Sequence, residues 1–261
     1  MVDENKSLKQ YNTFGIEATA RYFTTFNSLN TLQELLGTSP YKNLNLIILG
    51  GGSNLLLTKD VDGLVIKNEL NGIEVIKEYE EAVYIKAGSG ENWHQFVLYC
   101  LQNEFAGVEN LSLIPGSVGA SPMQNIGAYG VEIKDVFYEL EAFHIHDKTM
   151  HTFSLNDCEF GYRESVFKKK LKGQYIICSV TYLLNKKPHF TTSYGALQQE
   201  LDKMRVNELS INVISQAVIN IRSSKLPDWK VLGNAGSFFK NPQISISFFQ
   251  ELKNSYPQIP S

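Results

Sequence analysis

The sequence predicts an α+β fold with mixed sheets. Short runs of alternating or continuously apolar residues, each bounded by turn residues, are more frequent than stretches with helical periodicity. The chain has 261 residues, of which 43% are hydrophobic and 20% charged, as in an ordinary globular protein. At this length it can bury a substantial core.

The first part of the chain contains most of the predicted strands. Ser28 is expected to cap a short helix that ends at Gly37, because a hydroxyl suits the start of a helix and glycine its end. The run 46–49 is wholly apolar and predicts a buried strand. Strands are predicted at 20–26, 46–49, 63–67, 73–77 and 82–87.

The second part mixes helices and strands. A helix is predicted at 92–104 and another from Ser210 to about Arg222, each with one apolar face. Between them, 136–145 and 150–153 form a predicted hairpin. Ser154 is expected to cap a brief helix leading to Arg163. A further strand is predicted at 175–184.

Charge and composition exclude several classes of protein. The net charge is −3, and the one basic run, 168–170, is interpreted as a solvated turn, so no nucleic acid partner is expected. No apolar stretch reaches 18 residues and the N-terminus is polar, which predicts no membrane span, no signal peptide and a cytoplasmic location.

Cysteine and histidine patterns predict no metal site. Cys100, Cys158 and Cys178 are widely spaced, and burial is the default interpretation. His144 and His146 alternate on a predicted strand and would share one face, but no third ligand accompanies them.

Two glycine-rich segments indicate an anionic ligand. Gly50–Asn54 follows a predicted strand but lacks the Rossmann and Walker patterns, so a plain tight turn is the alternative. The stretch 114–130 is also rich in glycine, small and amide residues. Because backbone N–H groups in such loops can approach anions, the pair suits a ligand with two phosphates, such as a dinucleotide.

A third segment, Gly233–Pro242, presents the hydroxyl of Ser237 between small-residue hinges. No histidine lies nearby and the nucleophile-elbow pattern is absent, so the nucleophile interpretation is weak. Proton donation is favoured, and a plain turn residue is the alternative.

Six ordered motifs together resemble the family of UDP-N-acetylenolpyruvoylglucosamine reductases. They are Asn12–Gly15, Gly50–Asn54, 114–130, Phe160–Ser165, Lys225–Asp228 and Gly233–Pro242. The resemblance implies noncovalent FAD held by a two-lobed domain of the vanillyl-alcohol-oxidase (PCMH) type, and NADPH as electron source. It also implies UDP-N-acetylglucosamine enolpyruvate as acceptor, in bacterial cell-wall precursor synthesis.

The resemblance also implies catalytic roles. Reduction of the enolpyruvyl group places negative charge beside its carboxylate, which the Arg163 guanidinium would stabilise and which Ser237 would relieve by donating a proton. The alternative for Arg163 is an ion pair with Glu159 or Glu164.

The resemblance also implies which residues bind the substrate and the cofactor. The implied substrate-binding residues are Tyr129, Tyr162, Tyr194, Lys225 and Asn241. The implied cofactor-binding residues are Gly50, Gly51, Gly52, Ser53, Asn54, Ser117, Gly119, Ala120, Ser121, Gln124, Asn125, Gly127 and Arg222. The segment around Tyr194 resembles the longer (type I) subtype, although packing is its alternative role. A solvated helix end and a turn amide are the alternatives for Lys225 and Asn241.

The expected organisation is a FAD-binding domain at 1–224, with lobes at 1–68 and 69–224 that meet near Asn68, followed at 225–261 by the start of an α+β substrate-binding domain. The resemblance further implies a monomer and a late catalytic glutamate. After Pro242 the one acidic residue is Glu251, so a C-terminally truncated chain is expected. A non-catalytic FAD- and UDP-sugar-binding fragment, or another flavin oxidoreductase on the same scaffold, are the alternatives.

Overall fold

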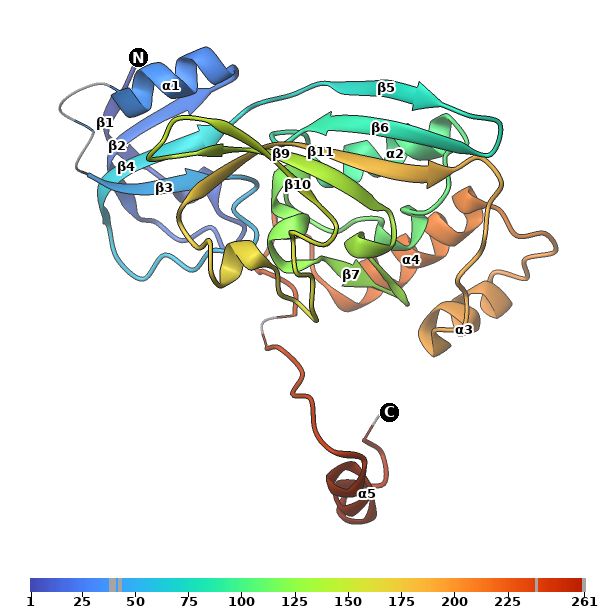
Figure 1. Ribbon diagram of the computed structural model, residues 1–261. Coiled ribbons are helices and arrows are strands. Elements are labelled where there is room, and N and C mark those ends of the chain that lie inside the picture. Colours follow the sequence, from blue (N-terminus) through green and yellow to red (C-terminus); the bar gives the residue numbers. More distant parts are fainter. Residues whose placement is uncertain (38–40, 42–43, 238, 260–261) are drawn as a thin grey trace.

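The computed structural model describes residues 1–37, 41, 44–237 and 239–259. Phe238, within the Gly233–Pro242 motif, and the last two residues of the 225–261 segment lie outside this part. Two main sheets organise the chain, a four-stranded one and a five-stranded one (Figure 1). The mixture of helices and strands confirms the predicted α+β class.

The first sheet has the order β1-β2-β4-β3. Its strands are β1 (Asp3–Ser7), β2 (Thr19–Phe26), β4 (Val61–Asn68) and β3 (Asn45–Leu49). β1 runs antiparallel to β2, whereas β4 is parallel to both β2 and β3. The ends of β3 and β4 therefore lie at the same edge of the sheet, and the Gly50–Asn54 loop begins there.

Both faces of this sheet are covered. Helix α1 (Leu29–Gly37) packs on one face, where its Leu32 joins a buried cluster with Phe26 and Ile66. That cluster includes Phe143 and Ile176 from the second sheet, so it joins the two sheets. The other face buries a cluster around Phe23 and Val65 beneath the 8–18 and 55–57 segments.

The second sheet is antiparallel, in the order β10-β9-β11-β6-β5. Its strands are β5 (Ile73–Glu78), β6 (Ala82–Gly88), β9 (Phe137–His144), β10 (Met150–Ser154) and β11 (Tyr175–Asn185). The largest buried cluster lies between this sheet and α2 (Trp93–Gln102). Asn92 caps that helix by accepting a hydrogen bond from the Gln95 N–H.

The predicted apolar face of α2 is confirmed, since Trp93, Phe96, Val97, Cys100 and Leu101 are all buried. All three cysteines are buried and unpaired. Short elements lie in the connections between strands. β7 (Gly127–Ala128) and β8 (Val131–Glu132) pair with each other, and 3-10 turns occur at Lys9–Tyr11, Glu109–Leu111, Val118–Ala120, Pro122–Gln124, Ile133–Asp135 and Val166–Lys168.

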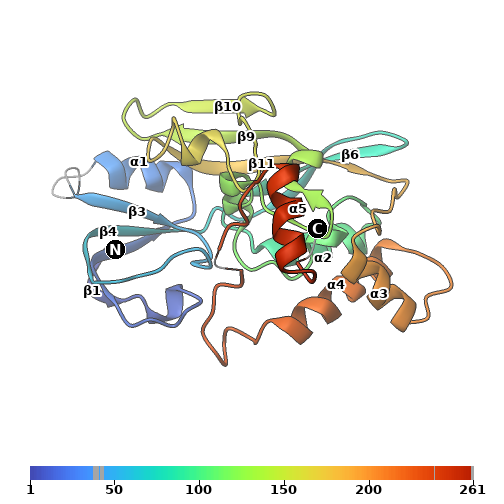
Figure 2. The ribbon, with the colours of Figure 1, turned by 90° about the horizontal axis from the view of Figure 1, so that it is seen from below.

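Three helices follow β11 in the part of the chain that the structure describes. α3 (Gly195–Lys203) and α4 (Ile211–Lys225) pack against each other through Leu197, Leu201, Ile214 and Val218. The predicted helix from Ser210 is confirmed, because the Ser210 hydroxyl caps α4. α5 (Ile246–Ser255) buries none of its residues. In Figure 1 it lies apart from the main body, at the end of an extended segment, and Figure 2 shows the same helix from below.

Three local expectations were wrong. No helix follows Ser154 in the described residues between β10 and Arg163, although the Ser154 hydroxyl accepts from the Asp157 N–H at 3.4 Å and the Asp157 carboxylate accepts from the Ser154 N–H, as at a helix start. A single turn forms there and ends at Glu159, which has a φ of 45°. β9 ends at His144, so His146 lies in the following turn rather than on the strand. β3 forms as predicted, but it is an edge strand whose one fully buried residue is Leu49.

No helix among the described residues is both long and apolar enough to cross a membrane.

Candidate functional site

The two predicted glycine loops pack directly against each other. A Cβ atom on Gly50 would lie 2.5 Å from the Ser117 hydroxyl oxygen, and one on Gly51 would lie 2.6 Å from Gly116 Cα. The Ser53 hydroxyl donates to the Pro115 carbonyl at 3.1 Å. The loops therefore need glycine at these positions for their mutual contact, and this contact fixes both of them beside one edge of the first sheet.

A second contact fixes the Gly52 end of this loop. Gly52 has a φ of +65°, and a Cβ there would lie 1.9 Å from the Tyr11 carbonyl oxygen. The Gly52 carbonyl accepts a hydrogen bond from the Thr13 N–H at 3.1 Å. The Thr13 hydroxyl oxygen is buried and has no hydrogen-bond partner among the described residues. A buried hydroxyl without a partner is costly, so this group is available to a bound polar ligand.

The Asn12–Gly15 motif also anchors the segment that carries Ser237. The Asn234 N–H donates to the Thr13 carbonyl at 2.9 Å, and a Cβ on Gly233 would lie 2.0 Å from the Phe14 carbonyl oxygen. Ser237 itself is exposed and makes no side-chain hydrogen bond in the part of the chain that the structure describes. The backbone before Ser237 is thus held close to the first glycine loop.

The loop 114–130 contains two side chains committed to the protein interior. The Ser121 hydroxyl bonds that of Tyr182 at 2.8 Å, deep in the core. Asn125 is fully buried and donates to the Glu132 carboxylate and the Gly161 carbonyl at 3.0 and 3.1 Å. These two predicted cofactor residues therefore shape the loop from inside, since their side chains and their backbone N–H groups bond within the protein.

Other predicted cofactor residues lie nearer the surface of this loop. The Gly119 N–H donates to the Ser89 carbonyl at 2.9 Å, and a Cβ there would lie 2.5 Å from Ser89 Cβ. Ala120 is exposed. The Gln124 side-chain carbonyl accepts from Asn54 at 3.0 Å, which links the two glycine loops through their side chains.

Arg163 lies on a tight turn that the 114–130 loop supports. Gly161 and Glu164 exchange backbone hydrogen bonds of 3.0 and 3.2 Å, and Arg163 has a φ of 55°. Its guanidinium donates to the carbonyl oxygens of Gly127 and Asn125 at 2.6 and 3.4 Å. Neutral carbonyls orient the guanidinium without neutralising it, so its charge remains available to an anion.

The expected alternative for Arg163, an ion pair with Glu159 or Glu164, does not occur among the described residues. Glu159 pairs with Lys170 at 2.6 Å. Glu164 pairs with Lys169 and, at 2.9 Å, with Lys240.

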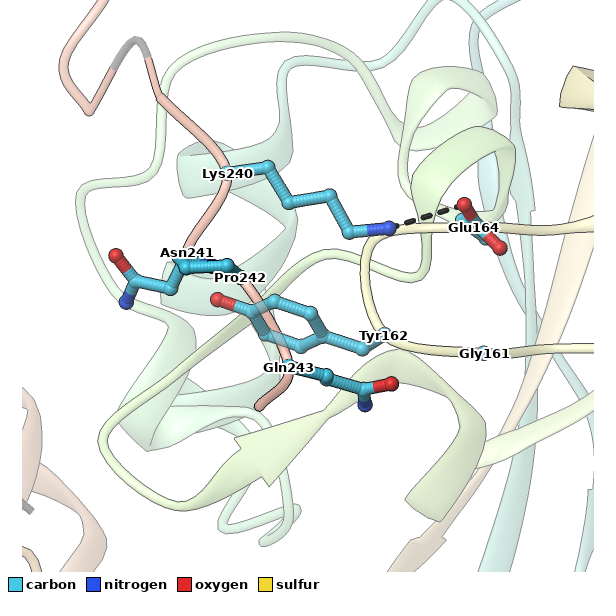
Figure 3. Close-up of a pocket in the computed structure, with 7 residues that line it drawn as sticks. All are labelled: Gly161, Tyr162, Glu164, Lys240, Asn241, Pro242 and Gln243. Carbon is cyan, nitrogen blue, oxygen red and sulfur yellow. Dashed lines mark hydrogen bonds and ion pairs between the residues drawn. The ribbon is translucent and has the colours of Figure 1, made fainter. Parts of the chain in front are cut away.

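A cavity of about 420 Å³ opens beside this turn and is lined by Gly161, Tyr162, Glu164, Lys240, Asn241, Pro242 and Gln243. Figure 3 shows Lys240 reaching from the C-terminal segment to Glu164, with the Tyr162 ring beside them. Hydrogen bonds from Lys169 and Lys240 lower the pKa of Glu164 to about 2. Two predicted substrate residues, Tyr162 and Asn241, thus line one cavity.

Three further predicted residues, Tyr129, Tyr194 and Arg222, lie near α3 and α4. Tyr194 directly precedes α3, and Arg222 lies in the last turn of α4. The rings of Tyr129 and Tyr194 meet edge to face, with centroids 5.6 Å apart. Arg222 on α4 is partly buried, which lowers its pKa. Its side chain donates to the Leu113 carbonyl at 3.2 Å and interacts with the Tyr129 hydroxyl. Burial and the neighbouring Arg222 charge lower the pKa of His94. Arg222 pairs with no carboxylate in the described ranges, so it is a second guanidinium suited to an anionic ligand.

The structure therefore joins most of the predicted residues in neighbouring groups. Lys225 is the exposed last residue of α4, and no hydrogen bond or ion pair links it or Ser237 to Arg163 within residues 1–37, 41, 44–237 and 239–259. Sequence reasoning gave no role to Thr13 or Lys240. The Asn12–Gly15 motif was the available signal for Thr13, whereas the pairing of Lys240 with Glu164 joins residues 76 positions apart.

No cluster of three or more metal-ligating side chains occurs among the described residues. The arrangement instead suits an organic anion. The two glycine loops lie against each other, and among the described residues the Thr13 hydroxyl has no partner and neither Arg163 nor Arg222 has a carboxylate partner. These groups offer donors to phosphate or carboxylate oxygens.

Comparison with known proteins agrees with this chemistry. Residues 20–153 match the model of a FAD binding domain family. A protein of Amoebophilus asiaticus named UDP-N-acetylenolpyruvoylglucosamine reductase is 51% identical over 259 residues, which cover 99% of this chain and 76% of the relative. A protein of the same name from Flavobacterium johnsoniae is 50% identical over the same shares.

Solved structures support the fold. The reductase of that name from Thermus caldophilus superposes with a TM-score of 0.67 at 23% identity, covering 97% of this chain and 79% of the other. A cholesterol oxidase from Brevibacterium sterolicum gives a TM-score of 0.51 at 14% identity over 71% of this chain and 38% of the other. Both likenesses confirm the predicted fold, and the family model confirms that it is a FAD-binding one.

Proposed function

The chain belongs to the family of UDP-N-acetylenolpyruvoylglucosamine reductases, and from this premise we propose that it reduces UDP-N-acetylglucosamine enolpyruvate to UDP-N-acetylmuramate. FAD is the proposed bound cofactor and NADPH the proposed electron source. The cofactor supplies reversible hydride chemistry when bound. The product is a precursor of peptidoglycan, so the proposed biological role is in cell-wall synthesis, cell shape and cell division.

The residues present fit a flavin dinucleotide. Gly50, Gly51, Gly52, Ser53 and Asn54 would offer backbone and side-chain donors to the diphosphate, opposite the donors of the 114–130 loop. The glycine positions leave no room for a Cβ, and the buried Thr13 hydroxyl lacks a partner among the described residues. Arg222 would supply a positive charge at the far side of the same loop.

The environment of Arg163 is the observation that supports the proposal most directly. Its guanidinium is held by the carbonyls of Gly127 and Asn125, and it has no carboxylate partner in the described part of the chain. A planar, permanently charged fork of this kind would bind the substrate carboxylate and stabilise the negative charge that develops beside it.

Ser237 is the proposed proton donor to the carbon next to that carboxylate. A hydroxyl is a weak acid, but an enolate carbon is basic enough to take its proton once the two are positioned. Its support is its place in the segment that docks on Thr13 and Phe14 beside the first glycine loop. Tyr129, Tyr162, Tyr194, Lys225 and Asn241 are proposed to bind the nucleotide sugar.

We also propose the domain division 1–224 and 225–261, with the first part divided near Asn68. All four strands of the first sheet precede Ile73, and all five strands of the second sheet lie at or beyond it, which supports a division there. A cytoplasmic monomer is proposed, and three unpaired, buried cysteines suit a reducing compartment.

Product analysis tests the function. The FAD-loaded chain is incubated with NADPH and the enolpyruvyl substrate, and the sugar nucleotide is analysed by mass spectrometry. A product heavier by two hydrogen atoms that requires both FAD and NADPH is expected. Unchanged substrate would contradict the proposal and favour a binding role without turnover.

A further inference from the structure

The three consecutive lysines at 168–170 differ in their partners. Lys169 pairs with Glu164, and Lys170 pairs with Glu159 at 2.6 Å. Lys168 has no carboxylate partner among the described residues, although its side chain does make hydrogen bonds. Lys169 and Lys170 therefore fit the interpretation of a solvated turn. The charge of Lys168 is not balanced by a carboxylate in the described residues.

The Lys168 ammonium lies where three parts of the site meet. It donates to the Gln124 side-chain carbonyl at 3.4 Å and to the Arg163 backbone carbonyl at 3.3 Å. The same Gln124 oxygen accepts from Asn54, at the end of the first glycine loop, at 3.0 Å. The Lys168 ammonium thus contacts the 114–130 loop and the Arg163 turn directly. It is linked to the Gly50–Asn54 loop through Gln124.

Both Lys168 contacts are long and involve neutral oxygens, so they hold the ammonium in place without balancing its charge. An ammonium has three donors, which leaves one for a ligand at this junction. A ligand bound by this donor would be anionic and would lie close to Asn54 and Gln124, two residues assigned to the cofactor by sequence.

We propose that Lys168 is an anion-binding residue of the cofactor site and binds a phosphate oxygen of the FAD diphosphate. This inference rests on the proposed function, because that function supplies the dinucleotide. Lys168 is exposed, so its contribution is sensitive to salt. A purely positioning role, in which Lys168 only holds Gln124 and the Arg163 turn, would instead change FAD binding by the same factor at every salt concentration.

FAD binding by the 261-residue chain, freed of flavin, distinguishes these roles. The dissociation constant is measured by quenching of flavin fluorescence in 50 and 500 mM KCl for the unsubstituted chain, K168M, K168R and K170M. K170M is the matched control, because it removes the same charge two positions away. K168Q is a second neutral variant, and far-UV circular dichroism checks that each variant folds.

K168M and K168Q are expected to bind FAD about tenfold more weakly in low salt and about twofold more weakly in high salt, since salt screens the lost attraction. K168R and K170M are expected to stay within about twofold of the unsubstituted chain in low salt. Equal behaviour of K168M and K170M, or a K168M defect independent of salt, would overturn the inference. An unsubstituted chain that binds no FAD would overturn the proposed function as well.

Discussion

Ser121 illustrates how a small side chain can support the site from inside the core. The Ser121 hydroxyl forms a hydrogen bond with the fully buried Tyr182 hydroxyl. Burial raises the pKa of Tyr182, so this phenol stays neutral. Ser121→Ala is expected to lower the free energy of unfolding by about 1–3 kcal/mol, because it leaves a buried donor without a partner. Urea unfolding measures the change.

The matched variant is the double substitution S121A/Y182F. Removal of both hydroxyls leaves no orphaned group, so this variant is expected to be more stable than S121A alone. If the two variants were equally unstable, the loss would come from packing rather than from the hydrogen bond.

Glu164 gives a pH-dependent prediction. Its pKa is lowered to about 2 from the usual 4.5 by hydrogen bonds with Lys169 and Lys240. The stabilisation from these pairs is therefore fully present above about pH 4.5 and is lost as the pH falls toward 2. Lys240→Met is expected to raise the pKa of Glu164, as followed by NMR of its carboxyl carbon.

Lys170→Met is the control for that titration, because Lys170 pairs with Glu159 instead. It is expected to leave the Glu164 pKa near its value in the unsubstituted chain. A Glu164 pKa that did not respond to Lys240→Met would show that this lysine does not hold the carboxylate in solution.

Residue types and motifs predicted much of the candidate site, but they did not predict how side chains divide their hydrogen bonds. Arg163 was expected from its motif, and the structure adds its two carbonyl partners. The inward orientation of Ser121 depends on Tyr182, 61 positions away. The Thr13 hydroxyl has no hydrogen-bond partner among the described residues. This too results from tertiary packing, which the local sequence does not indicate.

At the scale of elements, the packing of the Gly50–Asn54 loop makes a clear prediction. Gly52 and Gly15 both have a φ of +65°, but a Cβ on Gly52 would lie 1.9 Å from the Tyr11 carbonyl, whereas one on Gly15 meets nothing within 4 Å. Gly15→Ala is expected to cost about 1 kcal/mol of unfolding free energy from backbone strain alone. Gly52→Ala adds a backbone clash and is expected to cost about 3 kcal/mol or more.

Urea denaturation of the two variants measures this difference. Similar losses for both would mean that the loop moves away from Tyr11 without cost, and that Gly52 is required for its φ angle only.

Local sequence signals located most strands and the longer helices. Alternation and capping predicted β2, α2 and α4, because each has a clear apolar face and start signal. Ser154 and Asp157 do make reciprocal capping hydrogen bonds, but the predicted helix stops after a single turn because Glu159 has a φ of 45°, which is not helical. The polar strand β1 has no apolar alternation to reveal it, and its pairing with β2 is a tertiary contact.

At the scale of the whole molecule, α5 is expected to be dynamically independent of the body. It has 10 residues and buries none of them, and a helix of this length is only marginally stable without packing. Hydrogen exchange of its amides is therefore expected to be much faster than that of α2, which is buried along one face. Comparable protection in both helices would mean that α5 is packed in solution.

Sheet order is also a property of the whole molecule. The sequence predicted mixed sheets but could not place β4 between β2 and β3, or β11 between β9 and β6, because those pairings join distant segments. The cluster that joins the two sheets through Ile66 and Phe143 has the same long-range origin.

The proposed activity of this chain is the transfer of electrons from NADPH through bound FAD to an enolpyruvyl sugar nucleotide. Anaerobic stopped-flow absorbance tests it most directly, with the FAD-loaded chain and its S237A variant mixed first with NADPH and then with substrate. We expect flavin bleaching at similar rates in both, followed by fast recovery of the flavin band in the unsubstituted chain and slow recovery in S237A. Bleaching without substrate-dependent recovery in the unsubstituted chain would contradict the account.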